Sequence, residues 1–236
     1  MEVLQWLTDP ANWTGPNSIQ LRLLEHVEMS FVALVIAAAI ALPVGLFVGH
    51  TRKGGFTATS AANVGRAIPS FALLVLVFVA VSRVAPSLAF GFVPTVIALT
   101  CLAIPPILTN TTVGIENVDR DSVDAARGMG LSGRQVLTRL EIPLATPLIV
   151  AGLRTAAVQV VATATLAALI AGGGLGRFIV DGIALGTLGV PQLVGGAILV
   201  AALAIVTEVA FSALGRALRP RTSSTPSGGH AGVAST

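Results

Sequence analysis

Charged residues are scarce in this 236-residue sequence. They make up 11% of the chain, whereas hydrophobic residues make up 54% and the mean hydropathy is +0.87. A soluble domain carries charges on roughly a quarter of its residues, so this chain has more apolar surface than one aqueous core can bury. The composition excludes an ordinary soluble protein and indicates an integral membrane protein.

Lysine, cysteine and tyrosine are even rarer. The single lysine, Lys53, and the lack of basic clusters with interleaved aromatic residues argue against nucleic-acid binding, despite a calculated pI of 10.4. The single cysteine, Cys101, excludes an intrachain disulfide and a cysteine-based metal site. The three histidines, His26, His50 and His230, are far apart in the sequence and suggest no set of metal ligands.

Long apolar runs occupy most of the chain, and each approaches the roughly 20 residues that a helix needs to cross a membrane. We therefore expect an all-α membrane protein with five spans. The predicted spans are residues 29–49, 58–82, 92–113, 145–171 and 193–215. Residues 1–28 would form an extracytoplasmic segment, 29–215 the membrane domain, and 216–236, rich in Ser, Thr, Gly and Pro, a disordered cytoplasmic tail.

Basic residues are divided unequally between the two sides of these spans. Because Lys and Arg accumulate in cytoplasmic loops, the richer side is predicted to be cytoplasmic, with the N-terminus outside and the C-terminus inside. The richer side holds nine basic residues: Arg52, Lys53, Arg120, Arg127, Arg134, Arg139, Arg216, Arg219 and Arg221. The poorer side holds three: Arg22, Arg83 and Arg177.

The cytoplasmic connection between the third and fourth predicted spans, residues 114–143, is long for a link between helices. Asp121, Ser122 and Asp124 predict a helix start, because acidic groups are favourable near the N-terminal end of the helix dipole. Ala125, Ala126 and Met129 would give this helix a small apolar face, and Gly130 would interrupt it.

A second amphipathic helix is predicted after the turn at residues 131–133. Its apolar face would carry Val136, Leu137 and Leu140, with Arg134, Arg139 and Glu141 elsewhere, and Ile142 and Pro143 would stop it. A helix, a glycine turn and a second helix form a rigid unit that can dock into a groove on a partner. A folded loop without a partner is the alternative.

This loop resembles a known motif. Asp124-Ala125-Ala126, then Gly130, then Leu140-Glu141-Ile142-Pro143 stand at the spacing of the EAA motif of permeases in ATP-binding-cassette (ABC) importers. The chain departs from that motif in three mild ways, with Asp for Glu, Leu for Ile and Ile for Leu. The resemblance implies a coupling helix that enters a cleft on an ATPase subunit. The residues it assigns to ATPase coupling are Asp124, Ala125, Ala126, Gly130, Leu140, Ile142 and Pro143.

A narrower resemblance extends over about residues 20–215. Residues 66–70 (RAIPS), 151–159 (AGLRTAAVQ) and 171–179 (AGGGLGRFI) are similar to permeases for glycine betaine, carnitine and choline. The resemblance implies the five-helix type I importer core in a bacterial plasma (inner) membrane. It also implies two permease subunits, two ATPase subunits and an extracytoplasmic substrate-binding protein. Whether the second permease is the same chain or a paralogue stays open.

The chain holds no phosphate-binding loop, because Lys53 lies between Arg52 and Gly54 and no Gly-Lys-Ser/Thr sequence occurs. We therefore expect a non-enzyme without a cofactor of its own, with ATP and Mg bound by the partner ATPase. Quaternary ammonium groups are usually held by aromatic cages. The absence of tyrosine and the two tryptophans before the first span place high-affinity recognition in a separate binding protein.

Three charged residues fall within the predicted spans: Arg66, Arg154 and Glu208. At ~1.5 Å per residue they lie at a similar depth, about 12 Å from the cytoplasmic side, so Glu208 is predicted to pair with Arg154 or Arg66. The pair would either hold the bundle together or take part in gating. Pro69 breaks the helical hydrogen bonding beside Ser70, so these two residues are further candidates for the pathway, with a fixed packing kink as the alternative.

Two other functions remain in competition with an importer permease. A stand-alone secondary transporter or channel would need inverted repeats or a coupling carboxylate, for which only Glu208 qualifies. A scaffold subunit without a passage is the second. Within the importer class, ergothioneine, another small zwitterion or an amino acid remains a possible substrate.

Overall fold

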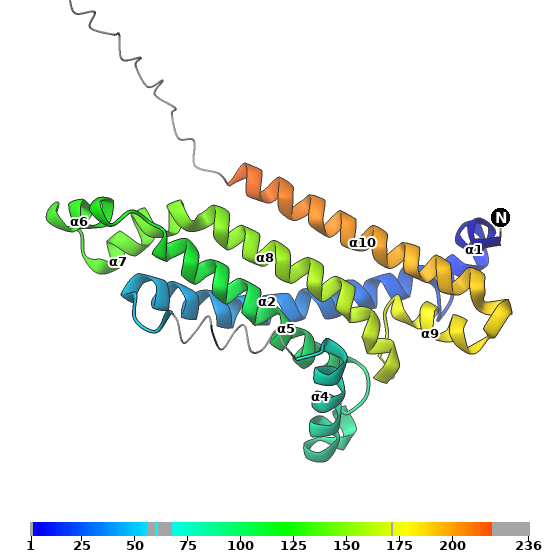
Figure 1. Ribbon diagram of the computed structural model, residues 1–236. Coiled ribbons are helices and arrows are strands. Elements are labelled where there is room, and N and C mark those ends of the chain that lie inside the picture. The colour runs from blue at the N-terminus through cyan, green and yellow to red at the C-terminus, as the bar shows by residue number, and fades with distance from the viewer. Residues whose placement is uncertain (1, 56–59, 61–67, 171, 219–236) are drawn as a thin grey trace, which may run out of the picture.

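The computed structural model describes residues 2–55, 60, 68–170 and 172–218, and its regular elements within these ranges are all helical. In chain order they are α1 (Glu2–Thr8), η1 (Pro10–Trp13), α2 (Ile19–Thr51), α4 (Ser70–Val84), η2 (Pro86–Leu88), α5 (Phe92–Glu116), α6 (Arg120–Gly128), α7 (Gly133–Val136), η3 (Leu137–Glu141), α8 (Ile142–Ala164), η4 (Thr165–Ile170), α9 (Gly176–Ala184), η5 (Gly186–Gly189) and α10 (Val190–Ala217). The fold is the predicted all-α class (Figure 1).

Four helical stretches among the described residues are long and apolar enough to cross a membrane: Ile19–Thr51, Phe92–Glu116, Gly133–Ile170 and Gly186–Ala217. They correspond to the predicted first, third, fourth and fifth spans. The predicted second span is only partly described, because residues 58, 59 and 61–67 lie outside the described ranges. The described part of it is the 15-residue helix α4. The predicted tail lies outside the described residues from position 219 onward.

The first spanning helix begins earlier than the apolar run that predicted it. Ser18 is its N-cap, and the Ser18 hydroxyl accepts a hydrogen bond from the Leu21 N–H at 3.3 Å. Such a cap satisfies a backbone donor that would otherwise lack a partner, so the helix starts at the cap and not at the first lipid-compatible residue. Its first turns carry Arg22 and Glu25, which form an ion pair at 2.9 Å.

The predicted helix stop at Ile142 and Pro143 is wrong. Helical structure continues from Gly133 through α7, the π-helical turn η3 and α8, so the helix that contains the fourth predicted span begins well before residue 145. In η3 the Ile142 N–H donates to the Leu137 carbonyl five residues earlier. Pro143 then occupies the first turn of α8, where its missing N–H is tolerated.

The core of the bundle lies between α2, α5 and α8. Alanines at every fourth position of α2, namely Ala33, Ala37 and Ala41, are fully buried against α5 and α8. A Cβ added at Gly45 or Gly49 would come within 2.8 or 2.7 Å of side-chain atoms on α5. The small residues along α2 therefore bring α2 and α5 into close contact.

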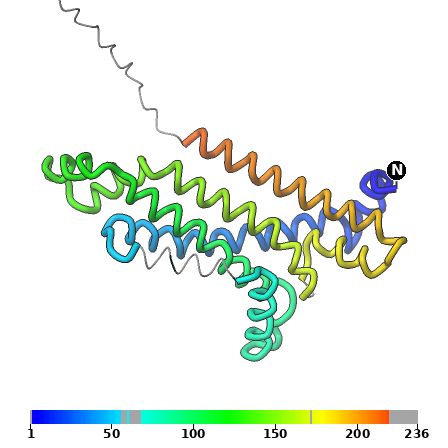
Figure 2. Tube along the Cα trace, in the orientation of Figure 1, coloured from blue at the N-terminus to red at the C-terminus, as the bar shows by residue number. Residues whose placement is uncertain are grey.

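Helix α10 runs along α8 and packs at its N-terminal end against α1 and α9. The described chain ends at the opposite end of the bundle from α1 (Figure 2). Several large apolar side chains of α10 face outward, including Ile205, Val206 and Val209. This helix therefore leaves apolar surface available for lipid or for another subunit.

Candidate functional site

The predicted docking loop is a folded unit, which we call the coupling unit and define as residues 118–141. It projects from one end of the bundle, where α5 ends and α8 begins (Figure 1). Four of its side chains are buried and form a small core of its own, supported by two partly buried leucines. The buried residues are Val118, Val123, Ala126 and Val136, and the leucines are Leu131 and Leu140. An apolar core of its own allows the unit to move as one body.

Asp119 caps the first helix of the coupling unit. Its Oδ2 atom accepts hydrogen bonds from the Ser122 N–H at 3.0 Å and the Ser122 hydroxyl at 2.8 Å. The bond from the Ser122 hydroxyl, followed by the backbone bond, lowers the pKa of the Asp119 carboxyl from its ordinary value. The sequence predicted a start at Asp121, Ser122 and Asp124 and missed Asp119, although an Asp three residues before Ser122 is a capping signal.

Gly130 ends this helix in the left-handed conformation, with φ of +88°. The Gly130 N–H donates to the Arg127 carbonyl at 2.9 Å, and the Leu131 N–H donates to the Ala126 carbonyl at 3.2 Å. These two bonds form a Schellman motif, which places a glycine where a side chain would strain the backbone. The predicted glycine interruption is confirmed.

The next helix starts at a capping box. The Ser132 hydroxyl accepts from the Gln135 N–H at 3.4 Å, and the Gln135 side chain accepts from the Ser132 N–H at 2.8 Å. This reciprocal pair fixes the direction of α7 relative to α6.

The three residues of the Asp-Ala-Ala motif point in different directions. Ala126 is in the small core at 5% exposure, whereas Asp124 and Ala125 are exposed. Met129 is also exposed, at 76%. The predicted apolar face of Ala125, Ala126 and Met129 is therefore split, because Ala126 packs inward and the other two face outward. Of the later motif residues, Pro143 is exposed and Leu140 and Ile142 are half-buried.

The C-terminal end of α2 is bonded to the coupling unit at two points. His50 Nδ1 lies within hydrogen-bond distance of Glu141 Oε2, and Glu141 is 1% exposed. The Arg52 guanidinium donates to the Val118 carbonyl at 3.0 Å. The sequence predicts only that Glu141 lies off the apolar face and that His50 belongs to no set of metal ligands. It gives no sign of their pairing, which depends on tertiary structure.

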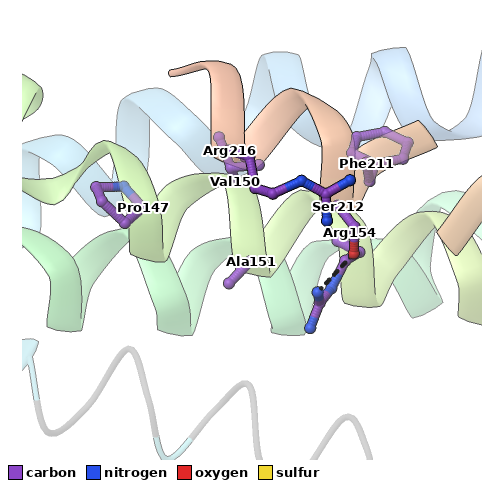
Figure 3. Close-up of a pocket in the computed structure, with 8 residues that line it drawn as sticks. Pro147, Val150, Ala151, Arg154, Phe211, Ser212 and Arg216 are labelled. Atoms are coloured by element: carbon purple, nitrogen blue, oxygen red, sulfur yellow. Dashed lines mark hydrogen bonds between the residues drawn. The ribbon is translucent and has the colours of Figure 1, made fainter. Parts of the chain in front are cut away.

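Arg154 of α8 and Glu208 of α10 form the predicted intramembrane ion pair. Arg154 Nη1 lies 3.3 Å from Glu208 Oε1. It also donates to the Ser212 hydroxyl at 3.1 Å (Figure 3). The alternative partner, Arg66, lies outside the described residues. Ser212 is a polar neighbour that the sequence did not single out, although it stands one turn after Glu208 on the same helix face.

Pro69 and Ser70 lie at the start of α4. Pro69 is the N-cap residue of that helix, and its carbonyl accepts from the Leu73 N–H at 3.0 Å. Helix α4 packs against α5 and η4, whereas Arg154 and Glu208 lie on α8 and α10. The described pathway candidates thus fall in two separate places within one chain.

Comparison with known proteins agrees with this architecture. Residues 21–224 match the family described as "Binding-protein-dependent transport system inner membrane component". The chain is 33% identical to the choline transport system permease protein OpuBB of Bacillus subtilis (strain 168), over 88% of this chain and 91% of that protein. It is 37% identical to the carnitine transport permease protein OpuCB of Listeria monocytogenes, over 84% and 86% respectively.

Among solved structures, the fold is similar to a chain of the inward-facing MetNI methionine ABC transporter. The TM-score is 0.76 at 24% sequence identity, and the match covers 90% of this chain and 100% of that chain. At this identity the likeness concerns the fold alone.

Proposed function

This chain belongs to the family of binding-protein-dependent transport system inner membrane components, and on that premise we propose that it forms the passage of an ATP-driven importer for small osmoprotectant solutes. A second permease subunit, either another copy of this chain or a paralogue, completes the passage. Two ATPase subunits supply the energy, and an extracytoplasmic binding protein delivers the solute. ATP and Mg are bound by the ATPase subunits and not by this chain.

The substrate class is proposed from the relatives. Similar permeases carry the names of choline, of carnitine, and of glycine betaine, carnitine and choline together. These solutes share a trimethylammonium group, which carries a permanent positive charge and has no N–H to donate. A permease of another small zwitterion or amino acid is the alternative within the same class.

The coupling unit is the observation that carries the ATPase part of the proposal. Its α6 helix presents Asp124 and Ala125 outward, as does the C-cap residue Met129, and the unit's own core holds the helix in place. A small side chain at Ala125 allows close approach of a partner, and an exposed Met is an adaptable apolar contact. We propose that α6 docks into a cleft of the ATPase and that Gly130, Leu140, Ile142 and Pro143 maintain its geometry.

The pathway residues are proposed in two groups. Arg154 and Glu208 lie in the cytoplasmic half of the bundle, and intramembrane charges usually face a water-filled cavity or the interior of an assembly. Pro69 and Ser70 begin α4 and would contribute backbone and hydroxyl groups from another side. Arg66, which lies outside the described residues, is kept in the proposal from its position in the sequence.

Uptake into proteoliposomes tests the proposed function. The chain would be reconstituted with its cognate ATPase, with ATP inside the vesicles and the binding protein outside, and uptake of labelled glycine betaine, carnitine and choline measured. ATP-dependent uptake of at least one solute is expected. Uptake that is independent of ATP would instead favour a secondary transporter, and no uptake of any of the three would refute the substrate class.

A pair of matched substitutions tests the docking surface. Met129→Asp places a charge on the exposed face of α6, whereas Leu4→Asp makes the same change on α1 at the other end of the molecule. The two side chains are 76% and 69% exposed, so neither change disturbs the described core. We expect Met129→Asp to weaken ATPase binding in a pull-down and Leu4→Asp to leave it unchanged. Equal binding by both variants would place the docking surface elsewhere.

A further inference from the structure

A cavity of about 360 Å³ opens between α8 and α10, in the half of the bundle that carries the coupling unit (Figures 1 and 3). Its described lining contains two charged side chains, Arg154 and Arg216, and no carboxylate. Ser212 and Phe211 are also part of the lining, and short side chains of α8 form the opposite wall. A hollow of this size and charge suits a small molecule with an anionic group.

The Arg154 guanidinium has donors left for a ligand. Its two described contacts, with Ser212 and Glu208, both use Nη1, whereas a guanidinium carries five N–H donors. Its side chain is 42% exposed and that of Glu208 is 45% exposed. Charges at this depth do not face lipid without large cost, so the exposed part of the pair must face water or another subunit.

Arg216 adds a second guanidinium group to the lining, and its side chain runs toward Ser212 (Figure 3). It stands eight residues after Glu208 on α10, so the two positions are about 12 Å apart along the helix axis. Phe211 lies between these two positions and offers an aromatic face of the kind that attracts quaternary ammonium groups. The groove thus presents an aromatic ring and two guanidinium groups, and the Glu208 carboxylate lies beside Arg154 next to the lining.

We propose that this cavity is a transient subsite for the carboxylate of zwitterionic solutes, with Arg154 as the primary contact and Arg216 as the second. In the structure, the Glu208 carboxylate holds the place beside the Arg154 guanidinium that the carboxylate of a solute would take. An entering zwitterion replaces it, its carboxylate contacting Arg154 and its trimethylammonium group contacting Glu208 and Phe211. The exchange leaves each charge with an opposite partner, so it buries no uncompensated charge. The inference rests on the proposed function and adds a residue-level basis for substrate choice.

The proposal separates two kinds of solute. Glycine betaine and carnitine carry a carboxylate, whereas choline carries a hydroxyl in its place. Arg154 therefore matters for the first two and little for choline, while Glu208 and Phe211 matter for all three. A static ion pair that only holds α8 against α10 would show no such selectivity.

The test compares glycine betaine and choline uptake by the complete importer in proteoliposomes. Arg154→Gln is expected to lower glycine betaine uptake about 10-fold or more, the effect of losing one charge-assisted hydrogen bond, and to change choline uptake by less than ~3-fold. Arg177→Gln is the matched control, because it removes an arginine that pairs with Asp181 at 2.7 Å outside the cavity. It should leave the ratio of the two uptakes unchanged.

A charge exchange, Arg154→Glu with Glu208→Arg, separates the subsite from a structural pair. Restored glycine betaine uptake in the exchanged variant would overturn the proposal, as would equal loss of both solutes in Arg154→Gln. Wild-type uptake of choline alone would also overturn the subsite while leaving the proposed function intact.

If the wild type takes up glycine betaine alone, failure of the exchanged variant to restore uptake supports the subsite. Lack of wild-type uptake of either probe defeats the proposed function itself.

Discussion

His50 Nδ1 lies 2.5 Å from Glu141 Oε2 and thereby joins the end of α2 to the π-helical turn of the coupling unit. Glu141 is almost fully buried, so its carboxylate depends on this contact for compensation. Arg52 adds a second bond between the same two parts at Val118. Displacement of the coupling unit by an ATPase would therefore be transmitted to α2, which packs along α5 and α8 through the bundle.

His50→Ala is expected to destabilise the protein by about 1–3 kcal/mol, because it leaves a buried carboxylate without its partner. The measurement is unfolding by SDS titration, with the half-buried neighbour Thr51→Ala as control. Adding Glu141→Gln to His50→Ala should recover part of the loss, since the buried group is then neutral. Equal stability of the two single variants would show that the contact contributes nothing.

Gly130→Ala should destabilise the coupling unit by about 1–2 kcal/mol, because φ of +88° suits a side chain poorly. Gly128 is the matched control. It is the last residue of α6, two positions before Gly130, and its φ is not positive. A Cβ added at either glycine would meet no atom within 4 Å. Gly128→Ala should therefore stabilise the helix by about 0.5–1 kcal/mol. Hydrogen exchange over residues 119–141 measures both effects, and shifts of the same sign would contradict this explanation.

Composition and arginine placement were enough to predict the class of fold and most spans, because lipid-compatible length is a property of local sequence. Helix ends were less predictable. The start at Ile19 depends on the Ser18 cap. Pro143 predicts the end of a helix, but it stands in the first turn of α8 after a π-helical turn, and such a turn has no clear sequence signal.

The site was predictable to the extent that its geometry is local. Gly130 and the Arg154–Glu208 pair were found from spacing and depth. The burial of Glu141 could not be predicted, because its partner, His50, is 91 residues away in the sequence. Such long-range pairs follow from the packing of α2 against the coupling unit and not from any pattern within either segment.

Asp119 gives the coupling unit a pH dependence of known sign. Its pKa is lowered in the folded protein by the bonds from Ser122, so its stabilising effect is present above the pKa of the unfolded chain and is lost as pH falls through the lower, folded value. Wild type should therefore lose protection of the α6 amides at roughly pH 4 and below. Asp119→Asn keeps a capping oxygen but cannot titrate, so its protection should not change over this range. Parallel loss in both proteins would assign the effect to another group.

Gly49→Ala tests how closely α2 and α5 approach. A Cβ at this position would lie 2.7 Å from Ile115 Cβ and 2.9 Å from the Thr112 carbonyl oxygen, and neither the branched side chain nor the helix backbone can move aside easily. Overpacking of this kind costs about 1–3 kcal/mol, so the variant should unfold at lower SDS than wild type. Gly128→Ala, which adds the same methyl group in open space, controls for the general effect of replacing glycine. If Gly49→Ala and Gly128→Ala unfolded at the same SDS concentration, α2 and α5 would be able to move apart near Gly49 more easily than their contacts indicate.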